Sequence, residues 1–161
     1  MIAPQLVIER ALACASVDDT IVIVTDSSDA TLRWAGNSMT TNGIATSRRW
    51  EVISIVRGAD TVRVGTVSST SVDPEDIAAV VRASEAAARS AEPAEDAMPL
   101  LPPDSVGAAS GSENWDRTAA HTSIDVFGSL ATELNVGFDG DDTLYGFAQH
   151  TVDNVWLGTS T

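Results

Sequence analysis

Short apolar runs broken by turn residues fill the stretch from residue 21 to residue 67. The runs are Ile21–Val24, Thr31–Ala35, Trp50–Val56 and Val62–Val67. Residues that favour turns separate them, and these are Ser27-Ser28-Asp29, Asn42-Gly43 and Gly58-Ala59-Asp60. The pattern predicts an antiparallel meander of about four strands.

Alternation within the third run assigns its side chains to the two faces of the sheet. Trp50 and Val52 lie on one face, and Ile53 and Ile55 lie on the other. Because both faces carry large apolar groups, we expect this strand to be central and covered on both sides. The continuous β-branched run Ile21–Val24 predicts burial on both faces as well.

The second run alternates between apolar and polar side chains. Leu32 and Trp34 point to one face, and Arg33 points to the other. We therefore expect Trp34 on the core side of its strand and Arg33 on the solvent side.

Helical patterns flank the predicted strands. Residues Pro4–Ala15 place apolar side chains at helical spacing, with Pro4 suited to the first turn. Asp73 is a predicted cap for a second helix, which begins at Pro74 and runs to about Ala91. A third helix is expected from about Ser123 to Leu134. With the strands, these helices predict an α+β fold.

The composition changes after Ala91. Residues 92–118 are rich in Pro, Gly and Ser and predict a linker, with residues 92–114 the first to be cut by proteases. The linker would join an N-terminal α+β domain, residues 1–91, to the truncated start of a second region, residues 119–161. In that region, Leu144–Thr161 predicts one long strand, or two that reverse near Asp153-Asn154. Since a strand needs a neighbour, we expect the chain to be the front part of a longer protein.

Charge and apolar content restrict the class of partner. The net charge is −14, and all 9 basic residues are Arg. An acidic surface repels phosphate backbones, so we expect no nucleic-acid binding. A membrane helix needs about 18 consecutive apolar residues, and no apolar run in the sequence is that long. We therefore expect a cytoplasmic protein without membrane contact. The single cysteine, Cys14, lies in a helical pattern and is expected to be a buried, inert thiol.

Candidate chemistry is sparse. The two histidines, His121 and His150, have no Cys partner, and we interpret His150 as a solvated or hydrogen-bonded strand residue rather than a metal ligand. The acidic stretch Asp139–Asp142 lacks the terminal Glu of a calcium loop and predicts a plain turn. Arg48-Arg49 predicts a solvated strand edge, and the four tryptophans predict core or interface anchors. We therefore assign no catalytic, cofactor-binding or metal-binding residue.

Several short motifs follow one another in a defined order. The run Thr31–Gly43 fits an R-x-x-x-N-x-x-T-x-N-G hairpin, and an R-x-G strand follows a Gly turn. The matching residues are Arg33, Asn37, Thr40, Asn42 and Gly43, then Gly58, Arg63 and Gly65. The strands Tyr145–His150 and Trp156–Thr161 complete the order. Together these motifs, which span nearly the whole chain, resemble the N-terminal region of the TldD/PmbA (TldE) family, and more the PmbA/TldE branch.

The resemblance implies a component of a cytosolic metal-dependent peptidase assembly that acts on small or unfolded peptides. TldD-type subunits carry an HExxxH helix in their C-terminal half, whereas PmbA/TldE-type subunits lack it and pair with TldD. This motif is not in the chain. No catalytic residue is therefore carried over, and any zinc belongs to the catalytic subunit. The implied partners are a peptide substrate and a second subunit, in a homodimer or in a heterodimer with a TldD-type subunit.

An alternative of another class stays open. The chain could be a standalone module that captures an extended peptide by adding it to a sheet edge. The apolar residues of the last predicted strand also lead us to expect self-association through that segment.

Overall fold

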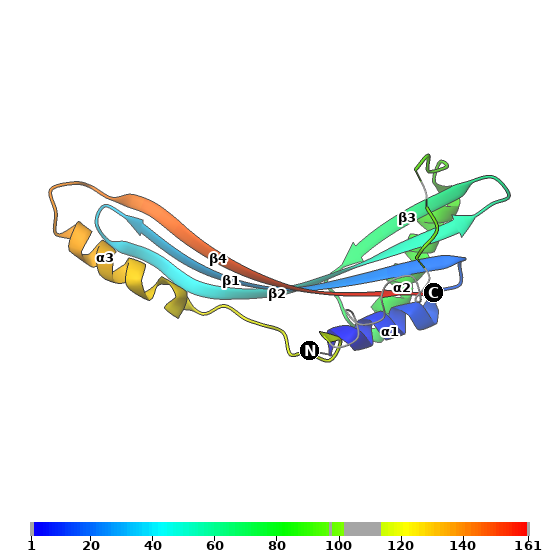
Figure 1. Ribbon diagram of the computed structural model, residues 1–161, viewed down its shortest axis with the longest axis horizontal. Coiled ribbons are helices and arrows are strands. Elements are labelled where there is room, and N and C mark those ends of the chain that lie inside the picture. Colours follow the sequence, from blue (N-terminus) through cyan, green and yellow to red (C-terminus); the bar gives the residue numbers. More distant parts are fainter. Residues whose placement is uncertain (1, 97, 102–113, 161) are drawn as a thin grey trace. The chain divides into compact units, whose positions relative to one another are not determined.

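The computed structural model describes residues 2–96, 98–101 and 114–160 (Figure 1). The strands are β1 (Asp19–Ala35), β2 (Met39–Arg57), β3 (Val62–Ser69) and β4 (Tyr145–Thr159). They form one four-stranded antiparallel sheet in the order β3-β2-β1-β4. The helices are α1 (Pro4–Cys14), α2 (Pro74–Ser90) and α3 (Gly128–Phe138), and α3 continues a 3-10 turn, η3 (Ile124–Phe127). The predicted α+β class is confirmed.

Strands β1 and β2 are longer than the apolar runs predict. The predicted turn at residues 27–29 lies inside β1, and the one at Asn42-Gly43 lies inside β2, so both turn predictions are wrong. The chain instead reverses at Gly36 and Asn37, whose φ angles are 58° and 59°. Two successive positive φ values favour a tight reversal between twisted strands, and the Ala35 N–H closes it on the Ser38 carbonyl at 2.9 Å.

Contacts between residues divide the chain into two compact units. Unit 1 comprises Met1–Thr25, Arg48–Thr118 and Val155–Thr161, and unit 2 comprises Asp26–Ser47 and Ala119–Asn154. Strands β1, β2 and β4 each contribute residues to both units. The linear division into residues 1–91, 92–118 and 119–161 stays a prediction.

Helices α1 and α2 form the core of unit 1 by packing against one face of the sheet. This face carries even-numbered residues of β1, β2 and β4 and odd-numbered residues of β3. Fully buried side chains on that face are Val22, Val24, Trp50 and Val52, and those on the helices are Val7, Ile8, Ala11, Ile77, Val81 and Ala88. Strand β3 comes so close to α2 that a Cβ at Gly65 would overlap the backbone of Ser84 and Ala88. The Ser84 hydroxyl lies in this contact and is within hydrogen-bond distance of the Val52 carbonyl at 3.0 Å and the Gly65 carbonyl at 2.9 Å.

The opposite face of the sheet in unit 1, which carries odd-numbered residues of β1, β2 and β4, is less buried than the face under the helices. Strand β2 is central, as predicted, and Ile55 is only 8% exposed, but Ile53, Ile21 and Ile23 are half-buried. On β4, the alternating pattern leaves Val155 60% exposed and Leu157 54% exposed. The expected covering of both faces is therefore confirmed at Ile55 and only partial at Ile53, Ile21 and Ile23, because α1 and α2 pack on one side of the strands (Figure 1).

Unit 2 has a smaller core beneath a single helix. It contains Ala30 and Leu32 of β1 with Phe127 and Leu134 of η3 and α3. Trp34 packs against this cluster and over Gly146, where a Cβ would lie 2.5 Å from the indole Cζ2. Trp34 is half-buried and Arg33 is exposed, which confirms the two faces that alternation predicts for this run.

Asn37 holds the tight turn against the chain between α3 and β4. Its side-chain amide donates to the carbonyls of Phe138 at 3.2 Å and Asp142 at 2.9 Å. Its side-chain oxygen accepts from the Leu144 N–H at 2.7 Å. Strand β4 then runs unbroken from Tyr145 to Thr159 beside β1, so it neither reverses near residue 153 nor lacks a neighbour.

The described parts of the predicted linker belong to unit 1 and make hydrogen bonds to the rest of it. The Ala94 N–H donates to the Val62 carbonyl at 2.8 Å, and the Trp115 carbonyl accepts from the Trp156 indole at 3.3 Å and from Gln5. Residue 97 and residues 102–113 lie outside the described residues, and the expectation that residues 92–114 are the first to be cut by proteases stays a prediction. Among the described helices, none is long and apolar enough to cross a membrane.

Candidate functional site

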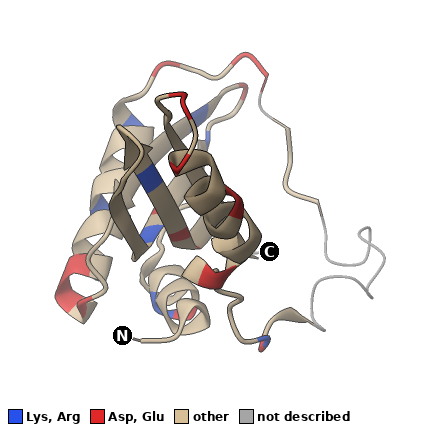
Figure 2. Ribbon diagram, turned by 90° about the vertical axis from the view of Figure 1, so that its left-hand side faces the viewer, with Lys and Arg blue, Asp and Glu red and all other residues tan. Residues whose placement is uncertain are grey.

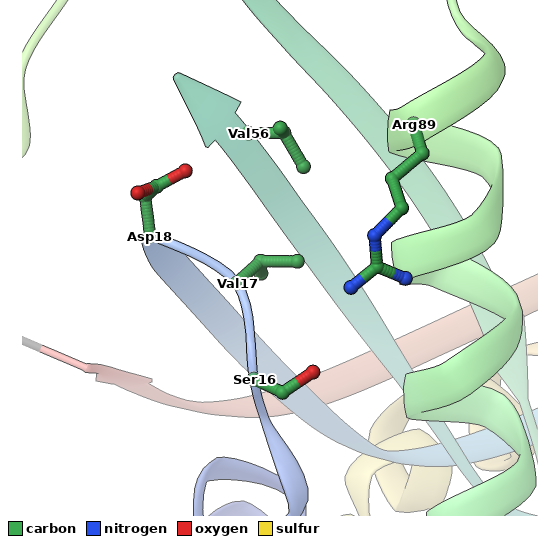
Figure 3. A pocket seen from close by; sticks show the side chains of 5 residues that line it. All are labelled: Ser16, Val17, Asp18, Val56 and Arg89. Atoms are coloured by element: carbon green, nitrogen blue, oxygen red, sulfur yellow. The ribbon is translucent and has the colours of Figure 1, made fainter. Parts of the chain in front are cut away.

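A shallow hollow of ≈ 320 Å³ lies in unit 1 between the end of α1, strand β2 and helix α2. Its lining residues are Ser16, Val17, Asp18, Val56 and Arg89. The Arg89 side chain extends from α2 toward the α1–β1 connection, as Figure 3 shows. The hollow therefore offers one guanidinium and two valine side chains to a ligand.

A buried carboxylate next to this hollow fixes its walls. Glu85 of α2 is 4% exposed, and its Oε1 accepts from the Ser16 N–H at 2.6 Å. Its Oε2 accepts from the Ser16 hydroxyl at 2.8 Å and from Arg89 at 3.3 Å. Burial raises the pKa of Glu85, but the hydrogen bonds from Ser16 and the Arg89 charge together hold this pKa below its ordinary value. Glu85 thus ties the α1–β1 connection to α2.

The acidic residues on the far side of the hollow are also engaged. Asp18 accepts from the Arg57 backbone N–H at 2.8 Å. Asp19 is paired with the Arg57 guanidinium, whose Nε lies 2.7 Å from Oδ2. These contacts join the start of β1 to the end of β2.

The chemistry of the hollow favours binding over catalysis. Ser16 has a carboxylate partner, but a carboxylate with a lowered pKa is a poor general base at neutral pH. The Arg89 guanidinium could hold a carboxylate or another small anion, although one of its nitrogens is already paired with Glu85. Sequence reasoning missed this cluster, because nothing local marks Glu85 as the partner of Ser16.

Both histidines lie in unit 2, and His121 is exposed. His150 is an exposed β4 residue whose Nδ1 lies 2.8 Å from the Thr122 hydroxyl, which confirms it as a hydrogen-bonded strand residue. Within residues 2–96, 98–101 and 114–160, no group of three or more His, Cys, Asp or Glu side chains could hold a metal ion.

The remaining residues considered from sequence have mainly structural positions. Cys14 is exposed rather than buried: it has the helical spacing of Val7 and Ala11, but it is the last residue of α1, where the helix ends. Arg48 donates to the Ile2 carbonyl, and Arg49 is exposed.

The tryptophans and the acidic turn are placed as anticipated. Trp50 and Trp156 are buried, Trp34 and Trp115 are half-buried, and the Trp50 indole donates to the Ser71 carbonyl at 2.7 Å. The acidic stretch after α3 is an exposed turn in which Asp139 caps the helix. These positions match the predicted anchors and the predicted plain turn.

Comparison with solved structures identifies the fold. TldE from Thermococcus kodakarensis matches over 96% of this chain and 36% of its own, with a TM-score of 0.53 and 12% identity. A proposed modulator of DNA gyrase from Bacteroides thetaiotaomicron matches over 99% of this chain and 46% of its own, with a TM-score of 0.57 and 12% identity. A second proposed modulator, from Thermotoga maritima, matches over 98% of this chain and 35% of its own, with a TM-score of 0.59 and 12% identity.

No family model and no curated protein matches the sequence. The chain spans about a third to a half of the length of the similar structures. Its fold is therefore that of part of TldE and of the TldD/PmbA-type gyrase-modulator structures.

Proposed function

We propose that this chain is a non-catalytic component of a metal-dependent peptidase assembly of the TldD/PmbA type, which acts on small or unfolded peptides. The observation that supports this most is the fold, which agrees with TldE over 96% of the chain. We propose a cytoplasmic location for the assembly, with a TldD-type subunit as partner and with zinc confined to that subunit. The net charge of −14 supports a protein that avoids nucleic acid.

Two motif residues have structural tasks that support the same proposal. Asn37 adopts a positive φ and makes three hydrogen bonds that secure the hairpin. Gly65 permits β3 and α2 to approach at backbone distance. Both positions belong to the motif order by which the sequence resembles the family, so this order coincides with demands of the fold.

The proposal is tested by reconstituting the activity. The chain and a TldD-type subunit from the same genome are expressed together and separately, and hydrolysis of an unstructured peptide is measured. We expect no hydrolysis and no bound zinc for the chain alone, and co-purification with the TldD-type subunit. One tightly bound zinc per isolated chain, or full peptidase activity of the other subunit without any binding of this chain, would contradict the proposal.

A second candidate function rests on strand β4. This 15-residue strand lies at one edge of the sheet and is exposed along alternate positions. Such an edge can accept an extended peptide by strand addition without any catalytic partner. Isotope-edited infrared or NMR titration with an unstructured peptide distinguishes the two, since only the binding module retains the peptide in the absence of a TldD-type subunit.

A further inference from the structure

We propose that the hollow beside α2 binds a small zwitterion whose ammonium and carboxylate groups are separated by a short aliphatic chain. The residues that line it come from the α1–β1 connection, β2 and α2, and they are Ser16, Val17, Asp18, Val56 and Arg89. All of them belong to unit 1, so the site lies within one compact unit. The proposal concerns ligand binding and does not depend on the peptidase assembly.

The two charged groups of the hollow lie on opposite sides of it. Figure 3 shows the Asp18 carboxylate on one side and the Arg89 guanidinium on the other, with Val17 and Val56 between them. A ligand that crosses the hollow therefore meets an anion, two aliphatic side chains and a cation in that order.

Both charged groups keep capacity for a ligand. Asp18 accepts a hydrogen bond from the Arg57 backbone N–H at 2.8 Å, and within the described part of the chain no cation is paired with its carboxylate. The Arg89 side chain is 54% exposed and donates from Nη2 to Glu85 at 3.3 Å, which is long for a charge-assisted hydrogen bond. A guanidinium carries five N–H donors, so most of those of Arg89 are available.

The walls of the hollow are held in place before a ligand arrives. The buried Glu85 accepts from the Ser16 N–H at 2.6 Å and from the Ser16 hydroxyl at 2.8 Å, and it also pairs with Arg89. The Arg57 N–H fixes Asp18 on the other side. Because these groups are already positioned, binding costs less conformational entropy than it would in a mobile loop.

Charge selects a zwitterion over a simple ion. The chain has a net charge of −14, with acidic residues on its helices and loops (Figure 2), and this charge disfavours the approach of an anion. Asp18 adds a negative charge at the hollow itself, whereas a simple cation would meet the Arg89 guanidinium. A zwitterion has no net charge and can place each of its groups beside the opposite charge of the protein.

The size of the hollow limits the ligand to a few methylene groups. Its volume of ≈ 320 Å³ is at the lower end of the range of ligand pockets, about 300–1,000 Å³. Ion pairs at an exposed site contribute little free energy, so we expect a dissociation constant on the order of 1 mM. An ω-amino acid and a short peptide share this chemistry, and the experiment distinguishes them.

Amide NMR of the 161-residue chain during titration with 5-aminopentanoate tests the proposal. We expect saturable shifts at Ser16, Val17, Asp18 and Arg89. Pentanoate lacks the ammonium group and pentylamine lacks the carboxylate, so each should bind about twofold to fivefold more weakly. Glycylglycine has the same separation between its charges but carries a polar amide. Tighter binding of 5-aminopentanoate than of glycylglycine identifies an ω-amino acid as the source, and equal or weaker binding identifies a short peptide.

Two variants assign the charges to the two ends of the ligand. Asp18→Asn keeps an oxygen for the Arg57 N–H and should weaken 5-aminopentanoate about twofold to fivefold, without weakening pentanoate. Arg89→Gln should weaken it to a similar extent, without weakening pentylamine. The matched control Arg82→Gln makes the same change two turns earlier on α2, outside the hollow, and should leave every affinity unchanged.

Three results would overturn the proposal. They are an absence of shifts around the hollow up to about 20 mM 5-aminopentanoate, a zwitterion that binds no more tightly than pentanoate or pentylamine, and a loss of affinity in Arg82→Gln equal to that in Arg89→Gln. Far-ultraviolet circular dichroism checks that each variant retains the fold. The comparison of the ligands uses only the wild-type chain, so it decides the question even where a variant fails to fold.

Discussion

Unit 1 and unit 2 use the same strands with different partners. In unit 1, two helices pack against one face of the sheet and give a core that includes the fully buried Trp50, whereas unit 2 buries a smaller set of residues beneath α3 and η3. The tightest backbone contact, at Gly65, is in unit 1. Most of the stabilising burial is therefore expected in unit 1.

The face of the sheet that no helix covers differs between the two units in its side-chain chemistry. In unit 2 this face carries side chains that satisfy one another. Asp29 accepts from the Thr151 hydroxyl at 2.6 Å and from Gln149 at 3.2 Å, and Ser27 donates to Asp153 at 2.6 Å. Unit 1 carries aliphatic groups at the equivalent alternating positions. The comparison teaches that the same face of a continuous strand can be aliphatic along one part and polar along another, and that polar cross-strand pairs mark where the change occurs.

Truncation of a core tryptophan should have the largest effect and should show the difference between the two cores. Trp50→Ala removes a 1% exposed indole and should lower the free energy of unfolding by about 3–5 kcal/mol. Trp34→Ala, in the smaller core, should cost about 2 kcal/mol, and the exposed Arg33→Ala about 0.5 kcal/mol or less. Urea unfolding of the three variants measures this. Equal losses for Trp50 and Trp34 would remove the distinction between the cores.

Addition of one methyl group at the β3–α2 contact should come next. Gly65→Ala places a Cβ 2.8 Å from the Ala87 carbonyl carbon and closer still to other backbone atoms, so the helix must move, at a cost of about 3 kcal/mol. Gly43→Ala is the matched control, because nothing lies within 4 Å of its Cβ position. Thermal unfolding of the pair measures the difference, and a Gly65→Ala protein as stable as the control would show that β3 and α2 are not in close contact.

Removal of the Asn37 side chain, which holds the β1–β2 turn, should destabilise unit 2 by less than the Gly65→Ala change destabilises unit 1. Asn37→Ala loses three hydrogen bonds and a residue suited to positive φ, which together should cost about 2 kcal/mol. Asn37→Gly keeps the backbone freedom and isolates the hydrogen bonds. Hydrogen exchange should show faster exchange at the β1–β2 turn in both variants, with unit 1 amides unaffected. A uniform change across the chain would mean that the two units do not respond separately.

The smallest effect should be the pH-dependent contribution of Glu85. Its folded pKa lies below the ordinary value of 4.5, so its ionised form stabilises the fold above that pH, and this contribution is lost as the pH falls through the folded pKa. Glu85→Gln should therefore cost about 1–2 kcal/mol at neutral pH. The difference between wild type and variant should shrink as the pH falls below the ordinary value of 4.5 and through the lower folded pKa. A difference that does not change with pH would show that the charge of Glu85 is not what ties Ser16 to α2.

Elements defined by local chemistry could be predicted from the sequence. Helix α2 begins after its predicted cap residue at Pro74, and β3 follows its predicted run within two residues. The two turns were misplaced because the local signals were ambiguous. Asn42-Gly43 is a stronger hairpin signal than Gly36-Asn37, yet Asn37 gains three partners from the α3–β4 connection.

Features that depend on distant residues could not be predicted. The polar residues Ser27 and Asp29 resemble a turn in sequence, but in the fold they pair with Asp153 and Thr151 of β4. The hollow beside Arg89 likewise depends on Glu85 meeting Ser16, and no local pattern indicates that contact. Alternation did predict which residues share a face, but it could not tell which face the helices cover.

The most direct measurement of the contrast between the two units is native-state amide hydrogen exchange of the wild-type chain. Its readout is the free energy of opening at each backbone amide, followed in rising denaturant below the unfolding transition. We predict that the amides of Val22, Val24 and Val52 in unit 1 exchange only with the highest free energies, and that those of Ala30 and Leu32 in unit 2 exchange through a smaller opening. Equal free energies in the two units, or faster exchange in unit 1, would contradict the account.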